Sequence, residues 1–454
     1  MLLPAVLSGQ ATDSILVGAV TDSTGGGIQS AAVRATNKNT NFTYTAVANA
    51  AGEYRINDLS AGRYDVSVSA QRFALSSVAN VDLQLNRTSS VNFTLQVAAL
   101  STSVEVREAP STIDMASSQV LNSFDSRSAS DLIAASTGSG VLNFSLLGGG
   151  VASSGGIGSG AGPSVGGQRP SSNSFNIDGV DNNNHNVTGA VVYVSNEAVA
   201  QVTILQNQYG AEFSGGAGGI FNMVVKSGTN QLHGSLYEYL QNRNLDAVDA
   251  QLVHQGVYSM PRVDNNRLGA TLGGPVFKDK LFYYGNFEYL ANGEPSAPKG
   301  PVYAPTAAGY RTLDGLGGVS PTNLRVLEQY LPAAPAATRS TSVLGVNIPT
   351  GPLSLVAPSY YDCSDLVSGI DWNPGHLDQL RARYIYNRYS GIDTSANLPA
   401  FYSTVPNNRH LFSLSEFHTF SAEMENELRL SFNRENNNFA VGNQTFPGLD
   451  TFPN

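Results

Sequence analysis

The sequence has few charged residues and a single cysteine. Asp, Glu, Lys and Arg together make up 13% of its 454 residues, about half the share in an ordinary soluble domain. The lone Cys363 excludes a disulfide within the chain. The net charge of −10 is the opposite of the basic footprint that nucleic-acid binding requires. We therefore expect no nucleic-acid partner.

Motifs for catalysis, metal binding and cofactor binding are also missing. The sequence contains no Gly-x-Ser-x-Gly elbow in a strand–turn–helix context and no phosphate-binding loop. None of the six histidines forms a His-Glu-x-x-His motif or another close pair of metal ligands: His185, His233, His254, His376, His410 and His418. These absences argue against a hydrolase. We expect no catalytic residue, no metal and no cofactor.

Long apolar runs are absent as well. No stretch of 18 apolar residues exists, so no transmembrane helix is expected. Residues 1–14 open with a short apolar segment, Met1 to Ala11, that ends in small residues. We interpret residues 1–14 as the remnant of a signal peptide without its basic n-region, or alternatively as a disordered start.

Glycine and aromatic residues are abundant, with 46 Gly, 20 Tyr and 19 Phe. Such a composition favours antiparallel β-structure with many turns. Residues 15–98 show short alternating segments between turns, such as Tyr64, Val66 and Val68 alternating with polar residues. Strands at this spacing predict an all-β sandwich.

The same region resembles the carboxypeptidase regulatory-like domain. The resemblance rests on Gly18-x-Val20-x-Asp22, Gly52-x-Tyr54-x-Ile56 and Gly62-x-Tyr64-x-Val66-x-Val68. It implies a transthyretin-like (carbohydrate-binding-like) β-sandwich, and it does not imply a peptidase. We expect Tyr54 and Tyr64 to pack in the core.

A linker, residues 99–112, follows the sandwich and contains an alternating segment that stops at Pro110. Its position resembles that of the TonB box, which pairs with a periplasmic energy-coupling protein by adding a strand to a sheet edge. The candidate residues are Ser103, Val104, Glu105 and Val106. An ordinary linker strand is the equally weighted alternative.

Residues 113–228 resemble the plug domain of TonB-dependent outer-membrane transporters, in particular the Oar-like branch that also carries an N-terminal sandwich. Three segments carry the resemblance: residues 166–170 (GGQRP), residues 177–181 (IDGVD), and the stretch from Tyr209 to Asn230. The resemblance implies an α+β plug that blocks a barrel. The plug-motif residues are Gly167, Arg169, Asp178, Gly179, Asp181, Glu212 and Lys226.

Some of these residues also have simpler interpretations. Asp178-Gly179 is a tight-turn signal, and the segment lacks the spacing of a calcium-binding loop. The resemblance implies that Arg169 and Glu212 face the barrel wall, where ion pairs could hold the plug. It also implies a solute-facing loop, for which the candidates are Asn182, Asn183, Asn184 and His185.

Residues 229–454 contain longer alternating segments with the length and dyad pattern of transmembrane strands. The segments are 232–243, 266–274, 280–290, 380–389, 411–420 and 427–435. Short turns alternate with one long excursion, from Ala291 to about Asp371. The region predicts a partial antiparallel transmembrane β-barrel. Transporters of this kind need about 22 strands, and about six to eight candidates are present, so we expect a fragment of a longer protein.

Together these features predict TonB-dependent uptake of a bulky solute, an oligosaccharide, siderophore or peptide, across the outer membrane of a Gram-negative cell. The implied partners are a TonB-type protein, outer-membrane lipid and the solute, with the sandwich and plug on the periplasmic side. The alternative is a secreted or cell-surface carbohydrate-binding or adhesin protein built around the sandwich. The substrate is not encoded in any motif, because fold does not imply function.

Overall fold

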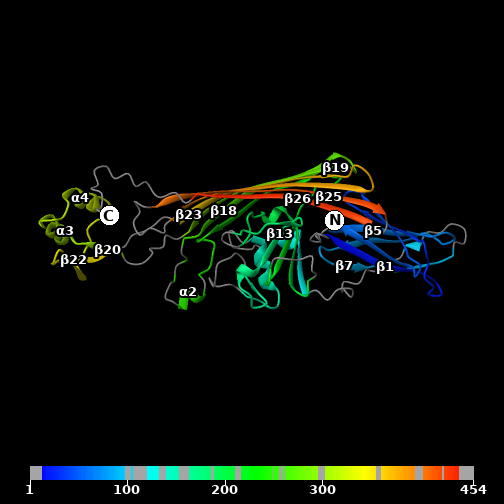
Figure 1. Cartoon of the computed structure of the whole chain (residues 1–454), viewed down its shortest axis with the longest axis horizontal. Coiled ribbons are helices and arrows are strands. Elements are labelled where there is room, and N and C mark those ends of the chain that lie inside the picture. The colour runs from blue at the N-terminus through cyan, green and yellow to red at the C-terminus, as the bar shows by residue number, and fades with distance from the viewer. Residues whose placement is uncertain are drawn as a thin grey trace, which may run out of the picture.

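A computed structural model of the whole chain gives the arrangement in Figure 1. The structure describes residues 13–97, 104–105, 120–131, 140–152, 163–185, 189–209, 216–248, 250–254, 258, 260, 262–294, 302–353, 359–393, 402–421 and 424–438. The fold is mainly β, as the sequence predicts. An N-terminal sandwich and a central domain both lie against one long sheet (Figure 1).

The N-terminal sandwich consists of two sheets in which most strand pairs are antiparallel. Its strands are β1 (Ser14–Asp22), β2 (Ala32–Asn37), β3 (Thr43–Val47), β4 (Glu53–Leu59), β5 (Gly62–Ser69), β6 (Ser76–Leu83), β7 (Thr88–Ser90), β8 (Phe93–Leu95) and β9 (Val104–Glu105). One sheet has the order β4-β1-β7, with β8 also paired to β1, and the other has the order β3-β2-β5-β6-β9. Alternate side chains of both sheets point between them and form one apolar core.

The two tyrosines expected in the core are buried there. Tyr54 is 4% exposed and Tyr64 is fully buried. The Tyr54 hydroxyl donates a hydrogen bond to the Val91 carbonyl oxygen at 2.6 Å, so its polar end is satisfied inside the core.

The central domain is built on a five-stranded sheet of order β10-β15-β16-β13-β14. Its elements are β10 (Val120–Asp125), α1 (Ser126–Asp131), a 3₁₀ helix η1 (Gly140–Leu147), β11 (Val151–Ala152), β12 (Ser164–Val165), η2 (Pro170–Ser172), β13 (Ser174–Ile177), β14 (Val180–Asp181), η3 (Asn196–Ala198), β15 (Val199–Asn207) and β16 (Ile220–Val225). The central strands β13, β15 and β16 are almost wholly buried, because elements pack on both of their faces.

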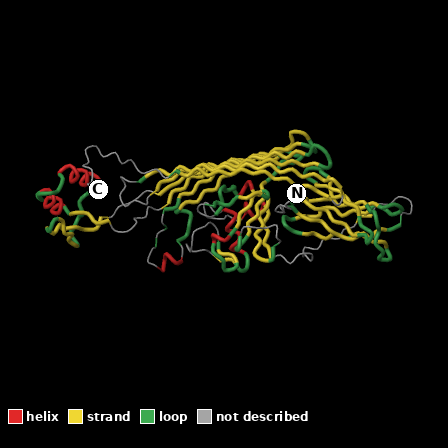
Figure 2. The backbone as a smooth tube through the Cα atoms, in the orientation of Figure 1, coloured by secondary structure: helices red, strands yellow, loops and turns green. Residues whose placement is uncertain are grey.

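The long sheet has seven antiparallel strands in chain order. They are β17 (His233–Asn242), β18 (Asp264–Phe277), β19 (Leu281–Glu294), β23 (Ser359–Trp372), β24 (Asp378–Asp393), β25 (Ser403–Ser421) and β26 (Met424–Asn437). In the described part of the chain β17 and β26 are the two edges, so the sheet is not closed. Figure 2 shows these strands running side by side along the length of the molecule.

The two faces of the long sheet differ in chemistry. The face that the central domain covers, here named the inner face, contains buried polar residues such as Arg383 and Asn387. The outer face exposes apolar side chains, for example Leu428, Leu430 and Phe432, which are 52%, 56% and 61% exposed. Polar-in, apolar-out alternation is the pattern of a strand whose outer face contacts lipid.

Strand connections are short at one end of the long sheet and long at the other. At the sandwich end, residues 278–280 and 373–377 form tight turns. At the opposite end, β19 and β23 are joined by a connection that holds a folded unit (Figure 1). This unit consists of β20 (Val302–Pro305), α3 (Ala307–Asp314), α4 (Pro321–Tyr330), β21 (Arg339–Val343) and β22 (Val346–Leu353). A further short helix, α2 (Ala250–His254), lies in the connection between β17 and β18.

The structure corrects the predicted excursion from Ala291 to Asp371 at both of its ends. Strand β19 continues to Glu294, and β23 already begins at Ser359. The alternation in β23 is hard to read from sequence because Asp362, Asp365 and Ser368 interrupt its apolar positions.

The sandwich is fixed to both of its neighbours by polar contacts. Arg381 of β24 forms an ion pair with Asp13, with Nη1 3.1 Å from Oδ1. The turn after β6 inserts against the central sheet, where the Leu85 amide donates to Gln201 Oε1 at 3.0 Å. Asn222 Nδ2 donates to Asn86 Oδ1 in the same turn at 2.8 Å. The sandwich therefore packs against strands β15 and β16 of the central domain.

Among the described residues, no helix is long and apolar enough to cross a membrane.

Two glycines of the sandwich give a matched test of its turns. Gly25 (φ +87°) and Gly52 (φ +80°) both adopt left-handed backbone conformations, but a Cβ at Gly52 would lie 2.4 Å from the Val20 carbonyl oxygen whereas one at Gly25 would meet nothing. We expect Gly25→Ala to cost about 1 kcal/mol through backbone strain. Gly52→Ala should cost about 1–3 kcal/mol more, because it adds a steric clash. Urea unfolding of residues 13–97 measures both, and equal losses would contradict the assigned turn geometry.

Candidate functional site: the interface between the central domain and the long sheet

The central domain shares a continuous apolar core with the long sheet. Phe175, Val202 and Phe221 of the central sheet belong to the same buried cluster as Ile385 and Leu411 of the inner face. Burial of such side chains contributes about 25 cal/mol for each Å² of apolar surface removed from water. Apolar packing therefore contributes to the adhesion of the two parts, and the polar contacts within this interface fix their relative position.

The strongest polar contact is centred on Arg383 of β24, whose side chain is 3% exposed. Its Nε lies 3.0 Å from Asp178 Oδ2 of the central domain. Its Nη2 lies 2.7 Å from Asp371 Oδ1 of the neighbouring strand β23 and 2.9 Å from Ser227 Oγ. One buried guanidinium thus joins the central domain to two strands of the sheet. A buried charge is tolerated only when it is paired and hydrogen-bonded in this way.

The turn that presents Asp178 has a specific backbone conformation. Asp178 (φ +46°) and Gly179 (φ +74°) both lie in the left-handed region, as a two-residue Asp-Gly hairpin between β13 and β14 requires. Asp178 Oδ1 also accepts a hydrogen bond from the Val225 amide at 3.2 Å. Burial raises the pKa of the Asp178 carboxyl, and the adjacent Arg383 guanidinium opposes that rise.

The same turn also reaches the edge strand β26. The carbonyl oxygen of Gly179 accepts a hydrogen bond from Arg429 Nη1 at 3.1 Å, and that of Asp181 accepts one from Asn433 Nδ2 at 3.3 Å. The segment 177–181 singled out in the sequence therefore lies at the wall of the sheet.

Two asparagines of the inner face bind the segment before η3. Asn387 accepts from the Tyr193 amide at 2.8 Å and donates back to the Tyr193 carbonyl oxygen at 2.9 Å. Asn286 Oδ1 accepts from the Ser195 hydroxyl at 2.7 Å. Because both asparagines are buried, these contacts are shielded from water.

Lys226 participates in a second polar cluster at this interface. Its Nζ lies 4.0 Å from Glu197 Oε2, and Glu197 Oε1 accepts a hydrogen bond from the Tyr239 hydroxyl of β17 at 2.5 Å. Burial lowers the pKa of Lys226, and the Glu197 carboxylate opposes this shift.

The four residues predicted to face a solute lie in different environments. Asn182 is buried, and its side chain exchanges two hydrogen bonds with the Val192 backbone. Asn184 is buried too, and it donates to Glu435 Oε2 of β26 at 2.5 Å. The side chain of Asn183 binds Asp181 and accepts from the Phe175 amide. His185 is the exposed member of the four, 3.4 Å from Asp181 Oδ2.

The remaining predicted residues do not gather at this interface. Gly167 and Arg169 lie on an exposed turn, and no described residue forms an ion pair with Arg169. Glu212 lies outside the described residues. Of the TonB-box candidates, Ser103 and Val106 also lie outside them, whereas Val104 and Glu105 form β9, which pairs in parallel with Ser76 and Ser77 of β6.

Sequence reasoning missed Arg383, Asn387 and Asn286, which are the partners of the central domain on the sheet. The sequence feature that marks them is a polar residue that alternates with the apolar, outward-facing positions of a strand. That pattern places a residue on the inner face, but it cannot name a partner that lies 205 positions away, as Asp178 lies from Arg383.

Comparison with known families agrees with the resemblance drawn from the sequence. Residues 224–454, half of the chain, match the model of the outer membrane beta barrel domain. Residues 15–96 match that of the carboxypeptidase regulatory-like domain.

Two curated relatives match parts of the chain. The TonB-dependent transporter Oar of Myxococcus xanthus is 31% identical over 259 residues, which is 56% of this chain and 24% of that protein. The probable TonB-dependent siderophore receptor PirA of Acinetobacter baumannii is 32% identical over 98 residues, 21% of this chain and 11% of that protein. The chain thus matches a quarter or less of the length of each relative.

Solved structures resemble the chain at low identity. The siderophore receptor PirA from Pseudomonas aeruginosa aligns with a TM-score of 0.43 at 14% identity, over 70% of this chain and 41% of that one. The siderophore receptor PirA from Acinetobacter baumannii aligns with a TM-score of 0.39 at 16% identity, over 61% of this chain and 34% of that one.

The Arg383 contact yields a stability prediction. Arg383→Met leaves Asp178 and Asp371 buried without their shared cation, so we expect a loss of about 3–5 kcal/mol in unfolding free energy. Arg388→Met is the matched control, because Arg388 lies on the same strand but is exposed, and it should change the free energy by less than about 0.5 kcal/mol.

Urea unfolding in detergent, followed by the fluorescence of the single Trp372 beside Asp371, measures both variants. Equal effects of the two substitutions would show that the buried ion pair does not hold the interface.

Proposed function

Since the chain belongs to the TonB-dependent transporters with an outer-membrane β-barrel domain and an N-terminal carboxypeptidase regulatory-like domain, we propose that it forms part of an importer of a bulky solute. The transporter lies in the outer membrane and is not an enzyme. Oligosaccharides, siderophores and peptides are the solute classes that we propose. The energy for import comes from a TonB-type protein in the periplasm.

The observation that carries this proposal is the position of the central domain on the inner face of the long sheet. The domain shares its core with that face and is bound to β24 through a buried ion pair. We propose that residues 113–228 act as the plug, residues 229–454 contribute to the barrel, and residues 15–98 form a periplasmic sandwich. The plug motif of Asp178, Gly179 and Asp181 then serves to seat the plug against the barrel wall.

The orientation in the membrane follows from the strand connections. Outer-membrane barrels have short turns on the periplasmic side and long loops on the extracellular side. The sandwich lies at the short-turn end, and the unit formed by β20, β21, β22, α3 and α4 lies at the long-loop end (Figure 1). We propose that this unit meets the solute first, because it lies at the end away from the sandwich. We propose His185 as a further contact, because its side chain is exposed to solvent.

Residues 103–106 are the proposed TonB box. Val104 and Glu105 pair with β6 through the backbone, as an added strand at the edge of the sandwich. TonB would take the place of β6 by the same kind of β-augmentation. The segment must therefore leave the sandwich before TonB can bind it.

Disulfide trapping in cells tests this assignment. We expect Val104→Cys in the full-length protein to cross-link to a cysteine-bearing TonB, because main-chain pairing brings the two strands within disulfide reach. Thr94→Cys, at an exposed position on β8 of the same sandwich, is the control and should not cross-link. Cross-linking at 94 equal to that at 104 would refute the proposed box.

A proline substitution gives an independent check. Proline removes a backbone donor from the ladder, so Val104→Pro should abolish TonB-dependent uptake while leaving the protein in the outer-membrane fraction. Unchanged uptake of the transported solute in the Val104→Pro strain would place the coupling segment elsewhere in the protein.

A further inference from the structure

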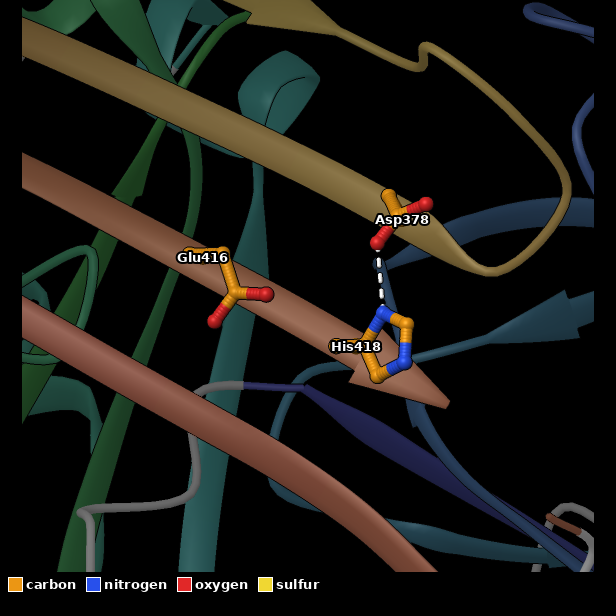
Figure 3. A group of neighbouring side chains, drawn as sticks. All are labelled: Asp378, Glu416 and His418. Carbon is orange, nitrogen blue, oxygen red and sulfur yellow. Dashed lines mark hydrogen bonds and ion pairs between the residues drawn. The ribbon is translucent and has the colours of Figure 1, made fainter. Parts of the chain in front are cut away.

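Three side chains with metal-ligand chemistry meet on the outer face of the long sheet, away from the interface described above. Asp378 is the first residue of β24, and Glu416 and His418 lie near the end of β25. Figure 3 shows all three on neighbouring strands, with Asp378 directed toward the His418 ring. One ligand atom from each lies within 4.8 Å of the other two.

The strand register explains this convergence. Asp378 is the cross-strand partner of His418, and Glu416 precedes His418 by two positions, so all three side chains point to the same face. No close ligand motif is visible in the sequence, because Glu-x-His becomes a chelating pair only in an extended strand. The third ligand lies 38 residues or more away in the chain.

Asp378 and His418 are in direct hydrogen-bond contact. His418 Nδ1 lies 2.5 Å from Asp378 Oδ1. In a tetrahedral zinc site with metal–ligand distances near 2.0–2.2 Å, neighbouring ligand atoms are about 3.3 Å apart. A metal ion would replace the proton between Nδ1 and Oδ1, and small side-chain rotations would bring the three donors to this spacing.

Two neighbouring side chains orient the donors. Asn426 Nδ2 donates a hydrogen bond to Glu416 Oε2 at 3.1 Å, as the outer partners of metal-bound carboxylates do. The Phe420 ring packs edge-on against the His418 ring, with centroids 4.3 Å apart.

The proximity of Glu416 to Asp378 favours a bound cation over an empty cluster. In the register of the sheet, Glu416 lies between Leu380 of β24 and Leu428 of β26, so its direct cross-strand neighbours are apolar. Carboxylate oxygens of Asp378 and Glu416 lie within 4.8 Å of each other, and two like charges this close repel unless a cation compensates them. With a neutral imidazole the three groups carry two negative charges, which a divalent cation neutralises.

We propose that Asp378, Glu416 and His418 form a zinc site on the outer face of the barrel, near its periplasmic end. One imidazole nitrogen and two carboxylate oxygens are a common zinc donor set, and water completes the tetrahedron. The ion cross-links β24 and β25 close to the turn that joins β23 to β24.

Calorimetric titration of the full-length protein in detergent with ZnCl₂, after treatment with a chelator, tests the site. We expect one zinc ion to bind, and His418→Ala and Glu416→Gln each to weaken its affinity by more than about tenfold. Asn426→Ala, which removes only the orienting hydrogen bond, should weaken it by about tenfold.

His410→Ala is the matched control. His410 lies on the same strand and the same face, but its partner is the Tyr384 hydroxyl, 2.9 Å away, rather than a carboxylate. Its replacement should leave zinc affinity unchanged. The heat-dependent mobility of the barrel on gels verifies that each variant is folded.

Two results would overturn the proposal. One is the absence of zinc binding by the wild-type protein. The other is zinc binding that persists unchanged in folded His418→Ala and Glu416→Gln, since the ion would then be held elsewhere and these residues would form only an ion pair.

Discussion

A single buried guanidinium constrains how the parts of this protein fit together. Arg383 is 3% exposed and is shared by Asp178 of the central domain and Asp371 of β23. Desolvating an unpaired charge costs several kcal/mol. The central domain is therefore held in the position on the sheet where Arg383, Asp178 and Asp371 are all paired. Apolar packing adds adhesion where Tyr284, Val367, Ile385 and Leu411 of the sheet meet the central domain, but it is not directional. The ion pair and the asparagine contacts made by Asn387 and Asn286 convert that adhesion into one position.

The remaining architecture follows from the same division between faces. Strands with a polar inner face and an apolar outer face can hydrogen-bond to the central domain on one side and contact lipid on the other. The sandwich closes the short-turn end through Asp13 and the turn at Leu85 and Asn86. The proposed TonB box is held as an edge strand of that sandwich. A pull on this segment would therefore act first on the sandwich and then on the central domain behind it.

Local patterns predicted the sandwich and most strands of the long sheet, because alternation and turn residues are encoded within about ten neighbouring positions. Strand β23 and the folded unit around α3 and α4 were hidden in a Pro-, Ala- and Gly-rich stretch without clear alternation. The pairing of Asp178 with Arg383 and the meeting of Asp378 with Glu416 and His418 depend on strand register between distant segments. No single stretch of sequence encodes that register, so these contacts required the structure.

Accessibility of a cysteine at the wall shows whether the central domain moves when energy is supplied. Ser195 is buried at the wall, bonded to Asn286. In a full-length background whose other cysteines are replaced by serine, Ser195→Cys should therefore resist a membrane-impermeant maleimide in isolated outer membranes. In cells with TonB and a proton gradient, labelling of Ser195→Cys should appear, and it should disappear when the gradient is collapsed. Labelling that is the same with and without TonB and the gradient would contradict the claim that this domain is a TonB-driven plug.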